Sequence, residues 1–335
     1  MTNYIVTRNY RENRRNSSKK TSSDFSDICV NHFDFVRLDF IMIANKVLRA
    51  PFVEINWRNQ LRKIKKNDIV WIQFPLYSSL GTNILFNYCK KVKAKIIILI
   101  HDIQYLRDFP TMRNEEISWL NRADTIIAHN DSMKQQFIND GVFVNIVTLK
   151  IFDFLDSNPF VTKLKKDDPI IFAGNLDKAP FLRKMDQIYP VNAFGITKNK
   201  KFPMNVNYFG SFDQEELAYE LQGSFSLIWD GDSTETCSGP LGEYLKINNP
   251  YKVSMSLALG IPVIIWKKAA LANFVSENKL GICVNSLQEI KYKINELSES
   301  EYQTLIINAK KQGEKLRNGF YSKNVIKTIL SNNGD

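Results

Sequence analysis

The chain has 335 residues, a length that favours two domains over a single hydrophobic core. Its apolar share of 44% is typical of a globular protein, and the absence of a run of about 18 apolar residues argues against a membrane-spanning helix. The net charge of +10 indicates an anionic partner, which leaves nucleic acid, anionic lipid and phosphorylated substrates as candidates.

Cysteine and histidine usage bears on compartment and metal content. The four cysteines lie far apart without a C-x-x-C pair, and only three histidines accompany them, so neither a disulfide framework nor a structural zinc site is expected. The N-terminus lacks the charged-then-apolar order of a signal peptide. We therefore expect a cytoplasmic protein.

In the first half of the chain, short apolar runs alternate with amphipathic stretches. Runs without polar alternation are typical of strands buried on both faces of a parallel sheet, and we expect them at 4–7, 68–74, 95–100 and 124–129. Helical spacing predicts helices at 80–93, 115–122 and 132–140, the last stopped by Gly141. This alternation predicts a βαβ domain.

The periodicity breaks at 152–168, where we place a linker. Beyond it, strands are expected at 169–174, 191–195, 205–210, 225–229, 262–266 and 281–284, and the last 50 residues look helical. The prediction is two doubly wound α/β domains, at 1–155 and 165–315, with a C-terminal helix at 316–335 that packs back on the first domain.

A helix start near residue 250 has the features of an anion site. Asn249 is a favourable N-cap, Pro250 fits the first helical position, and Lys252 adds a full positive charge one turn in. Free backbone N–H groups and the helix dipole would favour a phosphate here. The alternative is an ordinary helix start with a solvated lysine.

Ligands of open parallel sheets gather beyond the carboxyl ends of the strands. In the second domain those positions hold Gly174, Asn175, Lys178, Tyr208, Asp230 and Asp232. The glycine permits close backbone approach, the asparagine offers a donor and an acceptor, and the lysine adds charge. The alternative is a surface turn.

Asp230 and Asp232 have a spacing that can chelate a divalent ion, but two nearby lysines make a metal superfluous, and we favour a metal-free site.

In the first domain, His101 and Asp102 follow the most apolar strand, so the carboxylate would face a cleft between the domains, and a neighbouring imidazole or burial could raise its basicity. The alternative is that Asp102 serves only as an N-cap for the turn that follows.

His129 and Asn130 occupy the equivalent place after the next strand. They could contact the substrate or only form a turn. The segment 8–20 carries six basic residues and predicts a mobile loop over the cleft, with a solvated loop or a nucleic-acid arm as alternatives.

These features resemble glycosyltransferases of the two-domain, metal-independent GT-B architecture. The segments 172–178, 227–230 and 259–263 look like the glucosyltransferases that extend N-acetylglucosamine on serine-rich-repeat adhesins. Trp229-Asp-Gly-Asp-Ser233 and Gly242-Glu-Tyr-Leu-Lys-Ile-Asn-Asn-Pro250 look closer to bacterial β-1,6-galactofuranosyltransferases of O-antigen and capsule assembly.

The resemblance implies two Rossmann-like domains facing a cleft, with UDP between them. Lys178, Lys252, Tyr251 and the helix amides would lie on the diphosphate, and Tyr208 near the nucleoside. It also implies a cytoplasmic enzyme at the inner face of the membrane, a homo-oligomer, with a lipid-linked glycan acceptor and no nucleic acid. Lys178 stands where the adhesin-type relatives have arginine, which grips phosphate bidentately.

The sequence therefore predicts an inverting glycosyltransferase that moves galactofuranose from UDP-galactofuranose to a hydroxyl of a surface glycan, with no cofactor or metal and with Asp102 as the base. Glucosyl transfer from UDP-glucose to a glycosylated adhesin is the nearest alternative. A noncatalytic basic protein that binds nucleic acid or membrane is the alternative from another class.

Overall fold

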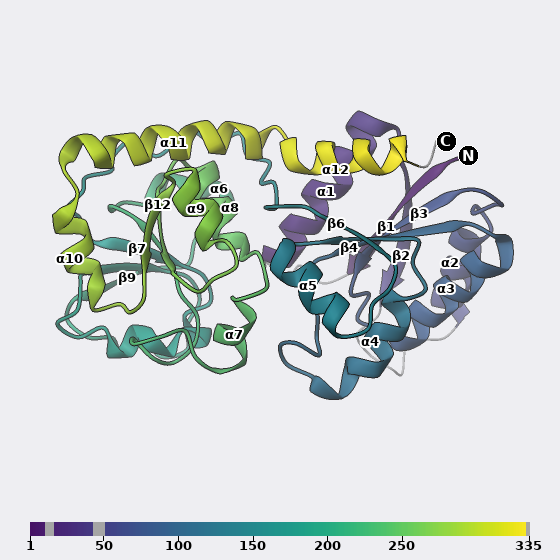
Figure 1. Ribbon diagram of the computed structural model, residues 1–335, viewed down its shortest axis with the longest axis horizontal. Coiled ribbons are helices and arrows are strands. Elements are labelled where there is room, and N and C mark those ends of the chain that lie inside the picture. Colours follow the sequence, from purple (N-terminus) through teal and green to yellow (C-terminus); the bar gives the residue numbers. More distant parts are fainter. Residues whose placement is uncertain (11–16, 43–50, 333–335) are drawn as a thin grey trace. The chain divides into compact units, whose positions relative to one another are not determined.

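The computed structural model describes residues 1–10, 17–42 and 51–332. The chain divides into two units, one formed by Met1–Lys150 with Tyr321–Asp335 and the other by Ile151–Phe320 (Figure 1). The residues that we assigned to a linker belong to the second unit, where the backbone N–H of Phe154 donates to Leu316 and that of Val161 to Leu259. In the described part of the chain, each unit contains one six-stranded parallel sheet.

The first unit has the strand order β2-β1-β3-β4-β5-β6. Its strands are β1 (Asn3–Tyr10), β2 (Val36–Met42), β3 (Ile69–Phe74), β4 (Lys95–Ile100), β5 (Thr125–Ala128) and β6 (Asn145–Thr148). Its helices are α1 (Ser17–Phe33), α2 (Pro51–Leu61), α3 (Ser79–Val92), the 3-10 turn η2 (Pro110–Met112), α4 (Arg113–Leu120), α5 (Asp131–Asn139) and α12 (Phe320–Ser331). The α-helices α2, α3, α4 and α5 pack on one face of the sheet, where their apolar side chains join a single core.

The second unit has the strand order β12-β11-β10-β7-β8-β9. Its strands are β7 (Ile170–Ala173), β8 (Val191–Phe194), β9 (Val206–Gly210), β10 (Ser226–Ile228), β11 (Val263–Trp266) and β12 (Gly281–Val284). Its helical elements are η3 (Leu176–Lys178), η4 (Pro180–Lys184), α6 (Gln214–Glu220), α7 (Gly239–Tyr244), α8 (Tyr251–Ala258), α9 (Ala272–Glu277), α10 (Glu289–Glu296) and α11 (Glu299–Arg317). The two doubly wound sheets confirm the predicted fold class.

Two strands of the first sheet were not predicted. β2 alternates apolar residues with Arg37 and Asp39, and β6 has only four residues. Both lie at the edges of the sheet, where one side of the strand is uncovered and polar residues are tolerated. The three predicted helices of this unit are confirmed to within two residues as α3, α4 and α5.

The basic segment 8–20 is not the single loop that we expected. Arg8 belongs to β1, and Lys19 and Lys20 belong to α1, so the loop prediction is wrong at both ends. Arg11, Arg14 and Arg15 lie outside the described residues. The helix forms although its sequence is rich in serine, because Phe25, Ile28 and Cys29 are buried against the sheet.

Candidate active site

The second unit has its topological switch point between β7 and β10. These strands are neighbours at the centre of the sheet, and from them the chain winds outward in opposite directions, to β8 and β9 and to β11 and β12. The loop that leaves β7 begins with Gly174. The loop that leaves β10 begins with Trp229, and Asp230 is its second residue. A crevice at such a point is where open α/β sheets bind ligands.

Lys252, the second residue of α8, reaches this point. Its Nζ lies 3.2 Å from Oδ1 of Asp230 and 4.6 Å from the centre of the Phe172 ring. A Cβ on Gly174 would lie 3.2 Å from its Cε. The side chains of Lys252 and Asp230 keep 25% and 23% of their surface exposed, so the ammonium remains accessible to an anion. The structure thus brings together three of the residues that the sequence nominated.

The start of α8 differs from the prediction by one residue. Pro250 has an extended ψ of 124° and is itself the N-cap, so Asn249 is not the cap and Pro250 is not the first helical residue. Asn249 is buried, 4% exposed, in the segment that leads into the helix. Tyr251 is the first helical residue, and its ring packs at 5.2 Å from that of Phe154. The N–H groups of the first turn therefore belong to residues 251 onward.

The backbone of Gly195, just after β8, lies directly against the loop after β7. A Cβ on Gly195 would lie 1.7 Å from the carbonyl oxygen of Gly174, so only glycine fits there. The hydroxyl of Tyr208 donates to the carbonyl of Gly195 at 3.1 Å. The ring of Tyr208 lies 5.9 Å from that of Phe202, which in turn carries the Arg183 guanidinium at 5.0 Å. Tyr208 is therefore fixed in orientation on β9, two strands from β7 in the sheet.

Asn175 directly precedes the 3-10 turn η3, and Lys178 is the last residue of that turn. The Asn175 side-chain oxygen caps this turn by accepting from the backbone N–H of Asp177 at 3.0 Å, which is the turn-forming role that we had set beside ligand binding. Lys178 is exposed at the end of the turn.

Asp230 and Asp232 each have a partner of their own. Asp230 is paired with Lys252, and Asp232 accepts from the Ser238 hydroxyl at 2.6 Å. This hydrogen bond, with Lys184 nearby, lowers the pKa of Asp232 below its ordinary value. Within residues 1–10, 17–42 and 51–332, no group of three or more histidine, cysteine or acidic side chains is arranged to hold a metal ion.

In the first unit, a series of hydrogen bonds through the Gln73 side chain holds His101 in place. The Oε1 of Gln73 lies 2.8 Å from Nε2 of His101, and because an amide oxygen only accepts, this ring nitrogen carries the hydrogen. The Nε2 of Gln73 donates to Ser26 Oγ at 2.8 Å and to the carbonyl of Val6 at 3.4 Å. Gln73 is 1% exposed, so its amide is locked in place.

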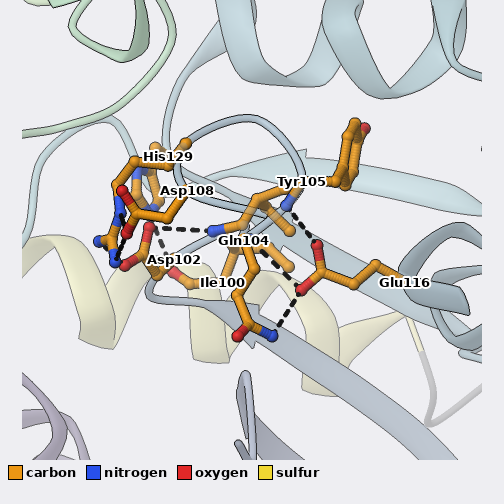
Figure 2. Close-up of polar contacts among 9 residues, drawn as sticks. Ile100, Asp102, Gln104, Tyr105, Asp108, Glu116 and His129 are labelled. Atoms are coloured by element: carbon orange, nitrogen blue, oxygen red, sulfur yellow. Dashed lines mark hydrogen bonds and ion pairs between the residues drawn. The ribbon is translucent and has the colours of Figure 1, made fainter. Parts of the chain in front are cut away.

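Asp102 lies directly beyond His101 and is buried, 9% exposed. Its Oδ1 accepts from the backbone N–H of Ile103 at 3.0 Å, and its Oδ2 forms an ion pair with the Arg107 guanidinium (Figure 2). The same guanidinium also binds Asp108 at 2.6 Å. Arg107 is thus shared between a buried and an exposed carboxylate, and it holds the loop that follows β4 in a turn.

Glu116 of α4 fixes the other side of this loop. It is fully buried and accepts from the backbone N–H of Tyr105 at 3.0 Å and from both amide nitrogens of Gln104 (Figure 2). Burial raises the pKa of Glu116, and the charge of Asp102 adds to this shift. The carboxylate that the sequence nominated as a base therefore sits on a loop with little freedom to move.

His129 and Asn130 have structural roles. His129 is 2% exposed and its Nε2 donates to the carbonyl of Ile100 at 3.0 Å, while burial lowers its pKa to about 3. Asn130 is the N-cap of α5 and accepts from the backbone N–H of Met133 at 2.9 Å. Of the two alternatives left open, the structure supports turn formation for Asn130. His129 is a buried neutral imidazole, which neither alternative described.

The sequence reasoning missed Gln73, Arg107 and Phe172. Gln73 had a signal, because it is the polar residue inside the apolar run of β3, and such a residue is found buried only with hydrogen-bond partners. The roles of Arg107 and Phe172 had no such signal, since they depend on loop geometry and on the reach of the Lys252 side chain from α8 to the Phe172 ring.

None of the described helices is both long and apolar enough to cross a membrane. Two family models match the chain: the N-terminal domain of the glucosyltransferase 3-like family over residues 3–151 and its C-terminal domain over residues 170–329.

Characterised relatives match most of the chain. It is 31% identical over 325 residues to beta-1,6-galactofuranosyltransferase WbbI of Escherichia coli K12, which covers 95% of each chain. It is 29% identical over 268 residues to glucosyltransferase 3 of Streptococcus gordonii, which covers 77% of this chain and 78% of the relative.

Solved structures agree in fold. Trehalose 6-phosphate synthase of Burkholderia multivorans matches with a TM-score of 0.62 at 7% identity, over 98% of this chain and 96% of that one. A trehalose-6-phosphate enzyme of Escherichia coli, bound with UDP-2-fluoro glucose, matches with a TM-score of 0.59 at 9% identity, over 98% and 99%. These neighbours have the GT-B fold. The chain is a GT-B glycosyltransferase and belongs to the glucosyltransferase 3-like family.

Proposed function

We propose that this glycosyltransferase moves galactofuranose from UDP-galactofuranose to a hydroxyl of a surface-glycan acceptor, with inversion at the transferred carbon. The similarity to beta-1,6-galactofuranosyltransferase WbbI extends over 95% of both chains, which supports the choice of donor. The observation that carries the proposal is the accessible Lys252 ammonium at the switch point, held between Asp230, Phe172 and Gly174.

In the proposed donor site the diphosphate lies against Lys252 and the first N–H groups of α8, with Lys178 adding a second charge. A charge-assisted contact and a helix N-terminus favour an anion for independent reasons, and both stabilise the charge that develops on departing UDP. Tyr251 lies beside the diphosphate and Tyr208 near the nucleoside, and Asp230 is available for the hydroxyls of the sugar. No metal takes part in this scheme.

The acceptor hydroxyl loses a proton during transfer, and we assign Asp102 as the base that takes it. The residue is buried and oriented by two partners, which is the arrangement expected of a positioned carboxylate. His101, oriented by Gln73, is the second candidate. We place the enzyme in the cytoplasm at the inner face of the membrane, as a homo-oligomer, with a lipid-linked glycan as acceptor.

Glucosyl transfer is the competing function, because glucosyltransferase 3 of two streptococci matches over 77% and 78% of the chain. Hydrolysis of UDP-galactofuranose and of UDP-glucose, measured as UDP release by the same enzyme preparation, separates the two. We expect faster release from UDP-galactofuranose. The NMR spectrum of the glycoside formed when a glycan acceptor is added should give the anomeric configuration. Faster release from UDP-glucose would reject the proposed donor.

A further inference from the structure

Helices α2 and α3 pack directly against each other in the first unit. A Cβ on Gly81 of α3 would lie 2.7 Å from Cη2 of Trp57 on α2, so the absence of a side chain at residue 81 lets the two helices meet. Both bury their inner sides in the same core, through Trp57, Leu61, Leu85 and Phe86. Their outer sides therefore lie next to each other, and we name the two together the α2–α3 face.

The two helices present the same order of side chains on this face. Ile55 on α2 is 55% exposed, and Arg58 and Arg62 follow it at helical spacing. On α3, Leu80 is 66% and Ile84 40% exposed, and the same stripe ends at Lys91. On α3 the aliphatic residues lie in the first half of the helix and Lys91 in its last turn, whereas on α2 Ile55 lies mid-helix, Arg58 in the last turn and Arg62 just beyond the helix. Along both stripes, aliphatic residues thus come before basic ones.

The basic ends of the two stripes are joined. The backbone N–H of Asn67, in the turn after α2, donates to the carbonyl of Lys93, at the end of α3, at 3.1 Å. The exposed basic residues around this contact are Arg62, Lys63, Lys65, Lys66, Lys90, Lys91 and Lys93.

Acidic residues do not balance this charge. The segment 51–95 contains two of them. Glu54 is paired with Arg58 at 2.5 Å, and Asp68 is 5% exposed and accepts from the backbone N–H groups of Thr2 and Lys65. The joined basic ends therefore carry a net positive charge at the surface.

We propose that the α2–α3 face docks on a bilayer that contains anionic phospholipid. Lysine and arginine next to a membrane surface are attracted to anionic headgroups, and exposed aliphatic side chains gain by entering the boundary between headgroups and acyl chains. Nucleic acid would use the charges alone, because its phosphates gain nothing from Ile55, Leu80 and Ile84. A bilayer with anionic headgroups can interact with both the basic and the aliphatic residues of the face.

The aliphatic end lies at the edge of the sheet that carries the proposed base. α3 starts five residues beyond the carboxyl end of β3, and His101 and Asp102 follow the carboxyl end of the neighbouring β4. A docked bilayer would accordingly lie nearest the edge at which a lipid-linked acceptor is deprotonated. This last consequence rests on the proposed function, whereas docking itself does not.

Sedimentation with vesicles tests the charge. The protein should pellet with vesicles of phosphatidylglycerol and phosphatidylcholine and stay in solution with phosphatidylcholine alone. Neutralising Arg62, Lys66, Lys90 and Lys91 to glutamine should lower binding roughly fivefold for each residue changed. The matched control neutralises Lys163, Lys165, Lys291 and Lys311, which are exposed on the second unit, and should retain wild-type binding. Equal losses in the two variants, or no binding to anionic vesicles, would overturn the proposal.

A second pair of variants separates a bilayer from other polyanions. Leu80→Gln with Ile84→Gln should weaken vesicle binding and leave binding of a short DNA duplex unchanged, while Ile307→Gln, an exposed isoleucine on α11, should alter neither. Unchanged vesicle binding in the Leu80 and Ile84 variant would overturn the proposal in favour of a general polyanion surface. None of these assays uses a sugar donor. Vesicle binding without galactofuranosyl transfer would therefore reject the proposed function and keep the docking surface.

Discussion

Gly174 and Lys252 fit together because residue 174 has no side chain. A Cβ there would lie 3.2 Å from Cε and 3.8 Å from Nζ of Lys252, and the backbone φ of +157° is one that other residues rarely adopt. The loop after β7 and the first turn of α8 can lie this close only because residue 174 is a glycine. The position of the ammonium therefore depends on a glycine as well as on the lysine itself.

Gly174→Ala should weaken UDP binding, because the added methyl group displaces the Lys252 side chain and strains the loop. Calorimetric titration with UDP measures the loss. Gly141→Ala is the control, since Gly141 also has a positive φ, +93°, but nothing within 4 Å of its Cβ position. That variant should lose thermal stability and keep its UDP affinity. If Gly174→Ala binds UDP as the wild type does, the lysine is not held by this contact.

Lys252→Ala should weaken UDP binding by about 1–3 kcal/mol, the range for a charge-assisted hydrogen bond. The fold should survive, because the side chain is 25% exposed at the surface of the unit. Asp230→Asn is the informative partner: it removes the carboxylate that pairs with Lys252 at 3.2 Å but takes no donor away from a phosphate. UDP affinity should fall in the first variant only. An unchanged affinity of Lys252→Ala would reject the phosphate site.

Chelation should leave the activity intact. Asp230 is paired with Lys252, and Asp232 accepts from Ser238, so each carboxylate of the Asp-x-Asp pair has a protein partner. In the proposed donor site, Lys252, Lys178 and the amides of α8 would supply the positive charge that a metal would otherwise bring to the leaving group. Transfer rates measured with and without excess EDTA test this. Loss of turnover that magnesium or manganese restores would make the two aspartates metal ligands.

The buried imidazole of His129 should make the first unit sensitive to acid. Burial lowers its pKa from 6.5 to about 3, so between these values the unfolded chain binds a proton that the folded chain does not. His129 therefore costs the folded state no stability above pH 6.5. As the pH decreases below that value, the free energy of unfolding decreases by at most about 1.4 kcal/mol per pH unit. Melting temperatures between pH 7 and pH 4 should drop less steeply in His129→Gln than in the wild type. His32→Gln, at an exposed position, should follow the wild-type curve.

Buried strands and the residues just beyond them were the predictable part of this protein. Apolar runs identified β4, β7 and β10, and the rule that ligands gather at carboxyl ends then nominated Asp102, Gly174 and Asp230. The edge strand β2 was missed because an edge tolerates polar residues such as Arg37. The partners Arg107 and Phe172 were missed because the path of a loop and the reach of a lysine side chain to a ring are tertiary properties, which local periodicity does not encode.

Asp102→Asn should lower turnover by roughly 10²–10⁴-fold, the usual effect of removing a general base, with UDP affinity nearly unchanged. Asparagine keeps the size of the side chain and an oxygen that accepts from the backbone N–H of Ile103, so the loop should hold its shape. It loses the charge that binds Arg107 and the ability to take a proton. The rate of UDP release from the sugar donor in the presence of a glycan acceptor and calorimetry with UDP give the two measurements.

Asp108→Asn is the matched control for this prediction. Asp108 binds the same guanidinium at 2.6 Å but is exposed, so its loss tests the ion-pair network without touching the proposed base. Turnover should stay near the wild-type value in that variant. Equal losses in both variants would mean that Asp102 acts only by holding Arg107 and the loop. Near-normal turnover of a folded Asp102→Asn enzyme would instead assign the proton transfer to another group. His101 would be tested next, together with Gln73→Leu, which removes the amide oxygen that fixes its Nε2 hydrogen.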